Sequence, residues 1–384
     1  MQLTGAWLDH PGTRAVCAAL LDAGYQALFV GGCVRDAVLG CPIGDIDIAT
    51  DALPEQVLNI ATNAKLKAVP TGVEHGTITL ISHGLAHEIT TFRKDVQTDG
   101  RHALVQFSKD VHQDAARRDF TMNALYATAD GRVLDPLGGM VDLVARRLRF
   151  VGDPGARIRE DYLRILRYFR FHAWYGDPQQ GLDQDALAAI AIDCDGLGQL
   201  SRERVGSEIL KLLSAPDPAP SVAAMRQTGV LPQVLPGSDD RALAVLIHLE
   251  GDLPPDPIRR LAVLGGENPG FALRLSKADT KKLCVLRDAI GDMSGPAELG
   301  YRHGYEMGRD VLLLRAAQFE KPVAPEDLKR IEIGAGAVFP VKSADLIPAY
   351  QGPALGQKLK ELEAKWIASN FALTQEQLCA DRDG

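Results

Sequence analysis

The segment Leu28-Phe29-Val30-Gly31-Gly32-Cys33-Val34-Arg35-Asp36, followed by Asp45-Ile46-Asp47, decides the fold of the first part of this chain. An apolar strand leads into two glycines, and glycine lets a backbone approach phosphates and present bare amide groups to an anion. Asp45 and Asp47 lie two residues apart in a strand-like run, so their side chains share one face. Two carboxylates on one face suit a hard divalent cation such as magnesium. A phosphate cradle beside a metal site indicates nucleotidyl or phosphoryl transfer.

The composition is that of an ordinary globular protein with room for two or three domains in 384 residues. No apolar run approaches the length of a membrane span, and the N-terminus lacks the layout of a signal peptide. We therefore expect a cytoplasmic location and no membrane contact. The six cysteines are scattered without a Cys-x-x-Cys pair, which disfavours a zinc site and a disulfide framework.

The net charge of −8 is unusual for a protein that binds RNA. Phosphate contacts depend on local clusters, however, and arginines gather at Arg117-Arg118, at Arg146-Arg147 with Arg149, and over 157–170. The acidic total favours an enzyme that releases its polynucleotide after a short reaction over one that holds long RNA.

The hydrophobic pattern predicts a small α/β head over 1–150 and an all-helical remainder, divided into 151–235 and 236–384. In the head we expect a helix over 12–24, a strand over 26–30, a helix that begins at 36–39, and a hairpin of 77–82 with 87–92. The polar segment 93–110 is predicted to be a mobile loop with at most a short strand over 105–107. The tail 375–384 is predicted to fray.

Two later runs carry chemistry as well. Arg117-Arg118-Asp119-Phe120-Thr121-Met122-Asn123 offers two cations for phosphate, and Asp119 and Asn123 are spaced to share one helical face. In 157–170, the apolar residues recur with helical spacing from Ile158 to Phe169 and predict a buried stripe. By themselves both runs are equally typical of amphipathic helices with solvated charges.

Five runs together resemble the motifs of one family in their order and spacing. They are Gly31-Gly32-Cys33-Val34-Arg35-Asp36 with Asp45-Ile46-Asp47; 117–125; Asp135-Pro136-Leu137-Gly138-Gly139 with Asp142; Glu160-Asp161-Tyr162-Leu163-Arg164; and Glu203-Arg204-Val205-Gly206-Ser207-Glu208. The family is the bacterial-type (class II) group of tRNA CCA-adding enzymes and poly(A) polymerases, within the polymerase-beta-like nucleotidyltransferases. The resemblance implies an α+β fold: a nucleotidyltransferase head with a mixed sheet, then an elongated all-helical neck, body and tail.

The resemblance also assigns roles to individual residues. Asp45 and Asp47 are implied to hold Mg²⁺ and to be catalytic. Glu88, on a neighbouring strand, is either a third catalytic carboxylate or a residue that faces water. Nucleotide binding is assigned to the following set: Gly31, Gly32, Arg35, Arg118, Asp119, Asn123, Glu160, Asp161, Arg164, Arg167 and Arg170. Within the family pattern, Asp119 and Asn123 favour ribonucleotides, and the segment 203–208 braces the neck.

Asp161 and Arg164 are implied to read the incoming base, with Glu160 orienting Arg164. A carboxylate beside a guanidinium complements both cytosine and adenine, since each presents an amino donor next to a ring-nitrogen acceptor. Guanine and uracil are rejected because a keto oxygen replaces the amino group. The implied substrates are CTP, ATP and the 3′ end of tRNA, and no obligate protein partner is evident.

Several alternatives remain within and outside this family. CCA addition is favoured over poly(A) addition, because Asp99-Gly100-Arg101-His102 resembles the loop of the CCA enzymes and no basic C-terminal extension is present. An enzyme that adds only CC or only A shares most of these motifs. From another class, an inactive RNA-binding module is disfavoured by the intact carboxylates. A dinucleotide-dependent dehydrogenase is disfavoured because the glycine run is not Gly-x-Gly-x-x-Gly.

Overall fold

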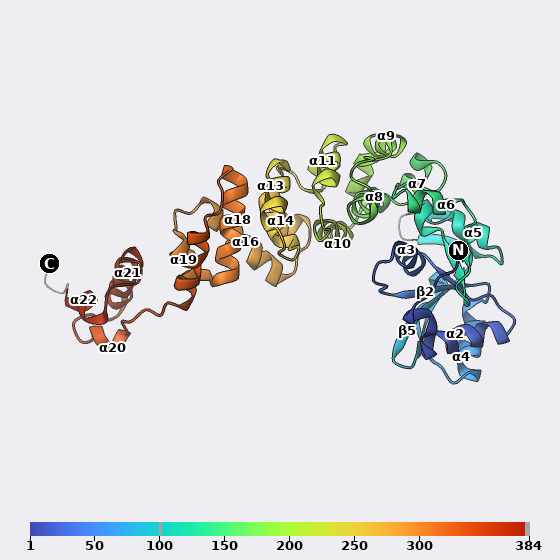
Figure 1. The fold of residues 1–384 in the computed structure, drawn as a ribbon, viewed down its shortest axis with the longest axis horizontal. Helices are drawn as coiled ribbons and strands as arrows, with labels where there is room; N and C mark the ends of the chain where they lie inside the picture. Colours follow the sequence, from blue (N-terminus) through green and yellow to red (C-terminus); the bar gives the residue numbers. More distant parts are fainter. Residues whose placement is uncertain (100–101, 381–384) are drawn as a thin grey trace. The chain divides into compact units, whose positions relative to one another are not determined.

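A computed structural model describes residues 1–99 and 102–380 of the chain. Its internal contacts separate two compact units, Met1–Pro236 and Gly237–Gly384. The first unit holds all the strands and the helices from α1 to α12, and the second holds helices α13 to α22 (Figure 1).

A mixed seven-stranded sheet forms the centre of the head, in the order β3-β4-β5-β2-β1-β8-β9. Strands β2 and β5 pair in parallel, whereas the other neighbours are antiparallel. The expected α+β class with a mixed sheet is thereby confirmed. The strands are β1 (Leu28–Val30), β2 (Ile46–Thr50), β3 (Lys67–Gly72), β4 (Thr77–Ser82), β5 (Leu85–Thr91), β8 (Tyr126–Thr128) and β9 (Val133–Leu134).

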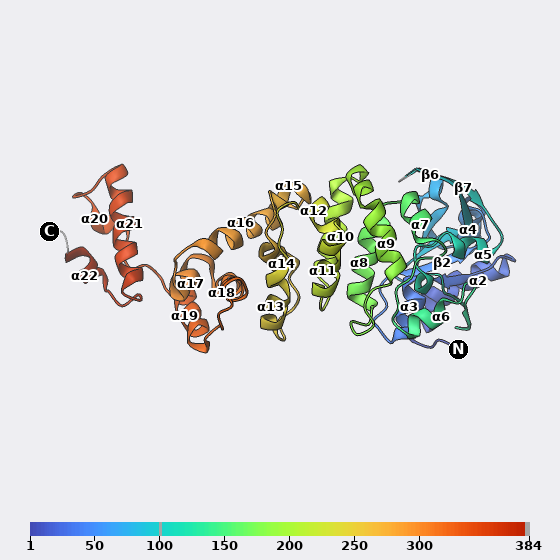
Figure 2. The ribbon, with the colours of Figure 1, turned by 90° about the horizontal axis from the view of Figure 1, so that it is seen from above.

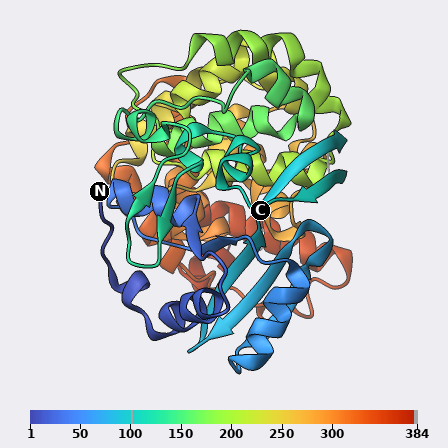
Figure 3. The same cartoon turned by 90° about the vertical axis from the view of Figure 1, so that its right-hand side faces the viewer.

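Helices α2 (Pro11–Asp22) and α4 (Pro54–Asn63) pack against β3, β4 and β5 on one face of this sheet (Figure 3). Burial alternates along β5, as expected for a strand with one covered face. His87 is buried toward α2, where its Nε2 lies 3.0 Å from the hydroxyl of Thr13. Glu88, the next residue, is exposed on the opposite face. The predicted hairpin of β4 and β5 is confirmed.

Strands β6 (Arg93–Asp99) and β7 (His102–Phe107) form a separate two-stranded antiparallel sheet (Figure 2). The prediction of a mobile loop over 93–110 is therefore wrong. An Asp-Gly pair between β-prone residues is a strong hairpin signal, and Asp99-Gly100 supplies it here. Residues 100 and 101, part of the loop that resembles the CCA enzymes, lie outside the described residues.

Helix α3 (Gly32–Leu39) begins directly at the glycine pair and not after Arg35 as predicted. Gly31 precedes the helix with a φ of 69°, a left-handed conformation that favours glycine. The two glycines therefore turn the chain from strand to helix without an intervening loop, and Arg35 lies inside the helix. The head also contains five short helices, which are α1 (Ala6–Asp9), η1 (Val73–His75), α5 (Val111–Ala116), η2 (Thr121–Asn123) and α6 (Gly139–Val144).

The neck helices confirm the expected all-helical remainder but differ in one break. The stripe from Ile158 to Phe169 is buried as predicted, yet it is divided between α7 (Pro154–Glu160) and α8 (Leu163–Tyr175). The ring of Tyr162 at this break packs so closely on Gly196 that a β-carbon there would lie 2.1 Å from it. The other neck elements are α9 (Gln184–Asp193), η3 (Cys194–Gln199), α10 (Arg202–Leu213), α11 (Ala219–Gln227) and α12 (Val230–Val234).

The second unit is entirely helical over its described residues. Its helices are α13 (Arg241–Glu250), α14 (Pro257–Leu264), α15 (Pro269–Ala272), α16 (Lys277–Gly291), α17 (Pro296–His303), α18 (Tyr305–Phe319), α19 (Pro325–Gly336), α20 (Ser343–Leu346), α21 (Pro353–Ala368) and α22 (Gln375–Ala380). The tail does not fray as far as predicted, because Leu378 of α22 is buried in a cluster with Trp366. Residues 381–384 lie outside the described range. No helix within 1–99 and 102–380 is long and apolar enough to cross a membrane.

Candidate active site

Three carboxylates meet on the face of the sheet opposite α2 and α4. Asp47 of β2 pairs directly with Glu88 of β5 in the parallel register, so both side chains point to the same face. Asp45 lies two residues before Asp47, just ahead of the strand. Asp47 is half-buried, whereas Asp45 and Glu88 are exposed. The structure therefore brings together the three predicted catalytic side chains.

The charge of this cluster is not balanced by hydrogen-bonded cations. Within the described residues, none of the three carboxylates forms an ion pair or a side-chain hydrogen bond. Burial and then the charge of Glu88 raise the pKa of Asp47 to about 6, with a smaller contribution from Asp45, and Arg118 opposes this shift. A bound cation would relieve this repulsion, since it favours the charged form of each carboxylate.

The donor set fits a hard divalent ion with few protein ligands. No group of three or more His, Cys, Asp or Glu side chains in the described part of the chain is arranged to hold a metal by itself. Mg²⁺ commonly takes one or two carboxylates and completes its octahedron with water and substrate phosphates. The Asp45–Asp47 pair matches that pattern. A ligand role for Glu88 stays a prediction.

The turn at Gly31 presents backbone amides next to a guanidinium. Gly31 caps α3 without a side-chain hydrogen bond, so the first amides of the helix are free of a capping side chain. A β-carbon on Gly31 would lie 3.4 Å from Nη1 of Arg118. Helix N-termini attract anions. Uncapped amides beside Arg118 therefore form a suitable cradle for phosphate.

Arg118 is held in place by two residues that sequence reasoning missed. Its Nη2 donates to Asp114 at 3.0 Å, and its Nε donates to the hydroxyl of Tyr126 at 3.0 Å. Tyr126 in turn donates to Asp114 at 2.6 Å, and Arg117 also pairs with this carboxylate. These arginine contacts overcome the effect of burial and keep the pKa of Asp114 below its usual value. The spacing of Asp114, three and four residues before the arginine pair, is a signal that could have identified it.

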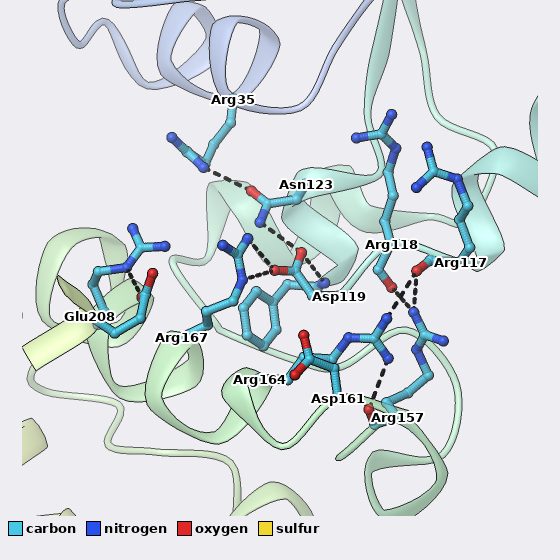
Figure 4. A network of polar contacts seen from close by, with 12 residues as sticks. Arg35, Arg117, Arg118, Asp119, Asn123, Arg157, Asp161, Arg164, Arg167 and Glu208 are labelled. Atoms are coloured by element: carbon cyan, nitrogen blue, oxygen red, sulfur yellow. Dashed lines mark hydrogen bonds and ion pairs between the residues drawn. The ribbon is translucent and has the colours of Figure 1, made fainter. Parts of the chain in front are cut away.

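A chain of polar contacts connects the head to α8 (Figure 4). Arg35 Nη1 donates to Oδ1 of Asn123 at 2.8 Å, and Asn123 Nδ2 donates to Oδ1 of Asp119 at 3.0 Å. Nε and Nη2 of Arg167 donate to the other oxygen of Asp119 at 2.8 and 2.6 Å. Asp119 and Asn123 thus contact each other directly, but the prediction that they share one face of a helix is wrong, because Asp119 precedes the short 3₁₀ turn η2 that holds Asn123.

The side chain of Arg35 is buried and already bonded to other residues of the protein. Its side chain is 7% exposed and also pairs with Asp36 at 2.9 Å. The hydroxyl of Tyr175 accepts from Arg35 Nη2 at 2.7 Å. Most of its donors are therefore used inside the protein, and its contribution to a nucleotide site includes holding Asn123.

The residues expected to read the base lie at the break between α7 and α8. Arg164 contacts Glu160, and its Nη1 also donates to the carbonyl of Arg157 at 2.8 Å. Asp161 has an extended backbone, and its Oδ1 accepts from the amide of Leu163, the first residue of α8, at 3.1 Å. Both Asp161 and Arg164 are partly exposed, which leaves them available to a ligand.

Helix α10 supports this region through two ion pairs. Arg204 Nη2 lies 2.8 Å from Oδ2 of Asp161, and Glu208 lies 2.5 Å from Nε of Arg170. Arg204 and Glu208 are four residues apart, so they share one face of α10. Arg170, predicted to contact nucleotide, is thus bonded to a neck residue, and its role toward nucleotide stays a prediction. Sequence reasoning assigned 203–208 a bracing role but did not identify Asp161 as the partner of Arg204.

Comparisons with known proteins identify the family of this chain. Residues 27–149 match the poly A polymerase head domain, and residues 181–241 match a probable RNA- and SrmB-binding site of polymerase A. The mitochondrial CCA tRNA nucleotidyltransferase 1 of Danio rerio is 42% identical over 378 residues, which span 92% of this chain and 86% of that protein. The chain belongs to the CCA-adding enzyme family.

Two other CCA-adding enzymes are also similar to this chain over most of its length. The CCA-adding enzyme of Lacticaseibacillus paracasei is 33% identical over 90% of this chain and 89% of that protein. The crystal structure of the Bacillus stearothermophilus CCA-adding enzyme in complex with CTP superposes with a TM-score of 0.72 at 29% identity, covering 96% of this chain and 95% of that one. Nucleotidyltransferases of this kind use a divalent metal.

Proposed function

We propose that this protein adds CCA to the 3′ end of tRNA without a nucleic-acid template, using CTP and ATP. It is a nucleotidyltransferase of the CCA-adding family. The structural observation that carries the proposal is the triplet Asp45, Asp47 and Glu88, which lies on one sheet face beside the Gly31 turn and forms no ion pair among the described residues.

The resident metal in this proposal is Mg²⁺, held by Asp45 and Asp47. When bound, the metal lowers the pKa of the attacking hydroxyl and neutralises charge on the triphosphate. The amides that follow Gly31 and the guanidinium of Arg118 bind the triphosphate. Because Asp114 and Tyr126 hold Arg118, this cation is oriented before the nucleotide arrives.

The incoming base is selected by Asp161 and Arg164 in place of a template. Glu160 and the carbonyl of Arg157 fix Arg164, so its guanidinium has a defined direction. The carboxylate of Asp161 accepts a hydrogen bond from the amino group of cytosine or adenine, and Arg164 donates a hydrogen bond to the adjacent ring nitrogen. Arg204 holds Asp161 in the free protein and competes with the base for its oxygens.

The domains share the work in this proposal. Residues 1–150 form the catalytic head, 151–235 form the neck that recognises the base, and 236–384 form the body and tail that bind tRNA. No observation favours poly(A) addition, partial CC or A addition, or an inactive RNA-binding module over CCA addition.

The test is incubation with Mg²⁺, labelled tRNA that lacks its 3′ CCA, and either CTP, ATP or both. We expect CTP alone to extend the tRNA to CC, ATP alone to leave it unextended, and the mixture to give CCA. A long adenosine ladder would instead indicate a poly(A) polymerase. A product that stops at CC in the mixture would indicate partial addition.

Asp47→Ala tests the assignment of the metal site in the same assay. We expect it to abolish incorporation of CTP and ATP while tRNA binding remains. Glu55→Gln is the matched control, because Glu55 is an exposed carboxylate on α4, on the other face of the sheet. Turnover of Asp47→Ala near that of the control would show that the metal assignment is wrong.

A further inference from the structure

Helix α8 directs three side chains from one stripe toward the head. Arg167, Phe171 and Tyr175 are spaced by four residues and so lie on the same face. Arg167 binds Asp119, and Tyr175 at the end of the helix binds Arg35. The guanidinium of Arg35 also lies 3.9 Å from the ring centroid of Tyr175, a cation–π contact. Tyr175 therefore fixes Arg35 by both its hydroxyl and its ring.

The position of Arg35 determines the orientation of the Asn123 amide. Arg35 donates to Oδ1 of Asn123, while Nδ2 of Asn123 donates to Asp119. An asparagine oxygen and nitrogen are distinguished by such partners, since a cation must face the oxygen and a carboxylate must face the nitrogen. Without Arg35 in this place, the amide would keep only one of its two restraints.

Of the two residues predicted to favour ribonucleotides, Asn123 has unused hydrogen-bonding groups and Asp119 does not. The carboxylate of Asp119 accepts one hydrogen bond from the amide of Phe120, one from Asn123 and two from Arg167. These four bonds occupy the lone pairs of the carboxylate. Asn123 retains one N–H and one lone pair on its oxygen. A ribose hydroxyl both donates and accepts, so it matches the remaining capacity of Asn123 and not that of Asp119.

We propose that Tyr175 is a positioning residue for sugar selection: through Arg35 it holds Asn123 in the orientation that recognises the 2′-hydroxyl of the incoming ribonucleotide. This inference rests on the proposed function and deepens it. Asp119 and Arg167 restrain the amide from the other side. Sugar preference is then set by a residue of the neck helix that does not itself contact the nucleotide.

The experiment compares kcat/KM for CTP and dCTP in Tyr175→Phe and in the wild type. The variant keeps the ring and loses only the hydroxyl that accepts from Arg35. We expect the preference for CTP to fall about five- to tenfold, an effect of the size of one ordinary hydrogen bond. The loss is expected in kcat/KM for CTP, with dCTP use unchanged.

Tyr168→Phe is the matched control. Tyr168 lies on the same helix, is fully buried, and its hydroxyl accepts from the amide of Asp183 at 3.0 Å, away from Arg35. It is expected to keep the wild-type ratio even if its melting temperature falls. In an Asn123→Ala background the preference should already be lost, and Tyr175→Phe should change it no further.

Each outcome decides between explanations. An unchanged ratio in Tyr175→Phe, or an equal loss for CTP and dCTP, would overturn the positioning role. A further fall in the Asn123→Ala background would show that Tyr175 acts by another route and would overturn it as well. Failure of the wild type to add CTP would instead contradict the proposed function, and this inference would fall with it.

Discussion

Two regions of this protein bury arginines against carboxylates, yet the two networks differ in what surrounds them. In the first unit, Asp119 and Arg167 are 10% and 33% exposed. In the second unit, Glu250 receives bonds from Arg259 and Arg260, and all three side chains are 2% exposed. The network of the second unit is thus almost completely withdrawn from water, whereas that of the first unit remains partly open.

The difference teaches that a buried arginine is not by itself a sign of function. In the second unit, Asp310 accepts from Arg259 at 2.9 Å and completes a group of ion pairs that joins α13, α14 and α18. In the first unit, the network lies in the same compact unit as Asp45, Asp47 and Glu88, which form no such ion pairs among the described residues. We therefore base the proposed catalytic site on the carboxylates that lack ion pairs among the described residues, more than on the paired arginines.

The largest expected effect is on catalysis, from Asp47→Asn. Loss of one metal-binding carboxylate is expected to lower kcat/KM for CTP by about a thousandfold, or about 4 kcal/mol. Stability is expected to stay unchanged or to rise, because the charged form of Asp47 is disfavoured in the metal-free fold. Primer extension and thermal melting without metal check the two parts. A large fall in melting temperature would show that Asp47 is structural.

Arg259→Met is expected to lower stability and not catalysis. Removing Arg259 takes one cation from Glu250, which keeps Arg260, and one from Asp310, which keeps Arg309. Loss of one partner of a buried ion pair typically costs about 3–5 kcal/mol of stability, and we expect a value at the lower end of that range. Urea unfolding of the full chain measures this loss. Arg241→Met is the control, since its side chain is 87% exposed and its pair with Asp239 is expected to contribute little. Equal stability of the two variants would contradict the comparison.

The pH dependence of stability tests the role of Asp119 in the partly exposed network of the first unit. Although burial opposes it, the charge of Arg167 and hydrogen bonds from Asn123 and Arg167 lower the pKa of Asp119 to about 2, against 3.8 for the ordinary group. A depressed folded-state pKa stabilises the fold above pH 4, and this contribution is lost as the pH falls from about 4 toward 2.

We therefore expect Asp119→Asn to lower the free energy of unfolding by about 2 kcal/mol at pH 7. The difference from the wild type should shrink as the pH is lowered toward 3, in urea titrations at each pH. A difference that stays constant over this range would show that the charge of Asp119 is not what stabilises the network.

The smallest effect on stability is expected for Arg204→Gln. The Arg204–Asp161 pair is about one-fifth exposed on both sides, so its loss should cost less than about 1 kcal/mol. Base choice is a sharper readout, because Asp161 loses the partner that holds it. We expect misincorporation of UTP relative to CTP to rise a few-fold. Discrimination equal to the wild type would show that Arg204 does not position Asp161.

The sequence was sufficient for those parts of the fold that depend on local patterns. The alternation around Asp47 and Glu88 placed both carboxylates on strands, and the β4–β5 hairpin was predicted from the same signal. The β6–β7 hairpin was missed because its polar composition outweighed the Asp99-Gly100 turn signal. The break before α8 was missed because a continuous apolar stripe crosses it, and Tyr162 is accommodated there by a glycine from a later element.

The contacts that organise the site depend on the docking of the neck against the head, which no local pattern records. The family resemblance assigns Arg35 to nucleotide binding, whereas its partners Asn123 and Tyr175 come from distant parts of the chain. Likewise, nothing in the run 160–164 indicates that Arg204 pairs with Asp161. Tertiary packing decides these contacts.

The close packing of Tyr162 on Gly196 has a consequence for how nucleotide choice can change. Asp161 belongs to the joint between two helices, whereas Arg164 is carried by α8 alone. Any residue larger than glycine at 196 would force the ring of Tyr162 to shift, next to the backbone that carries Asp161. Under the proposed role of Asp161 and Arg164, we therefore expect a substitution at 196 to alter nucleotide choice with every motif residue retained.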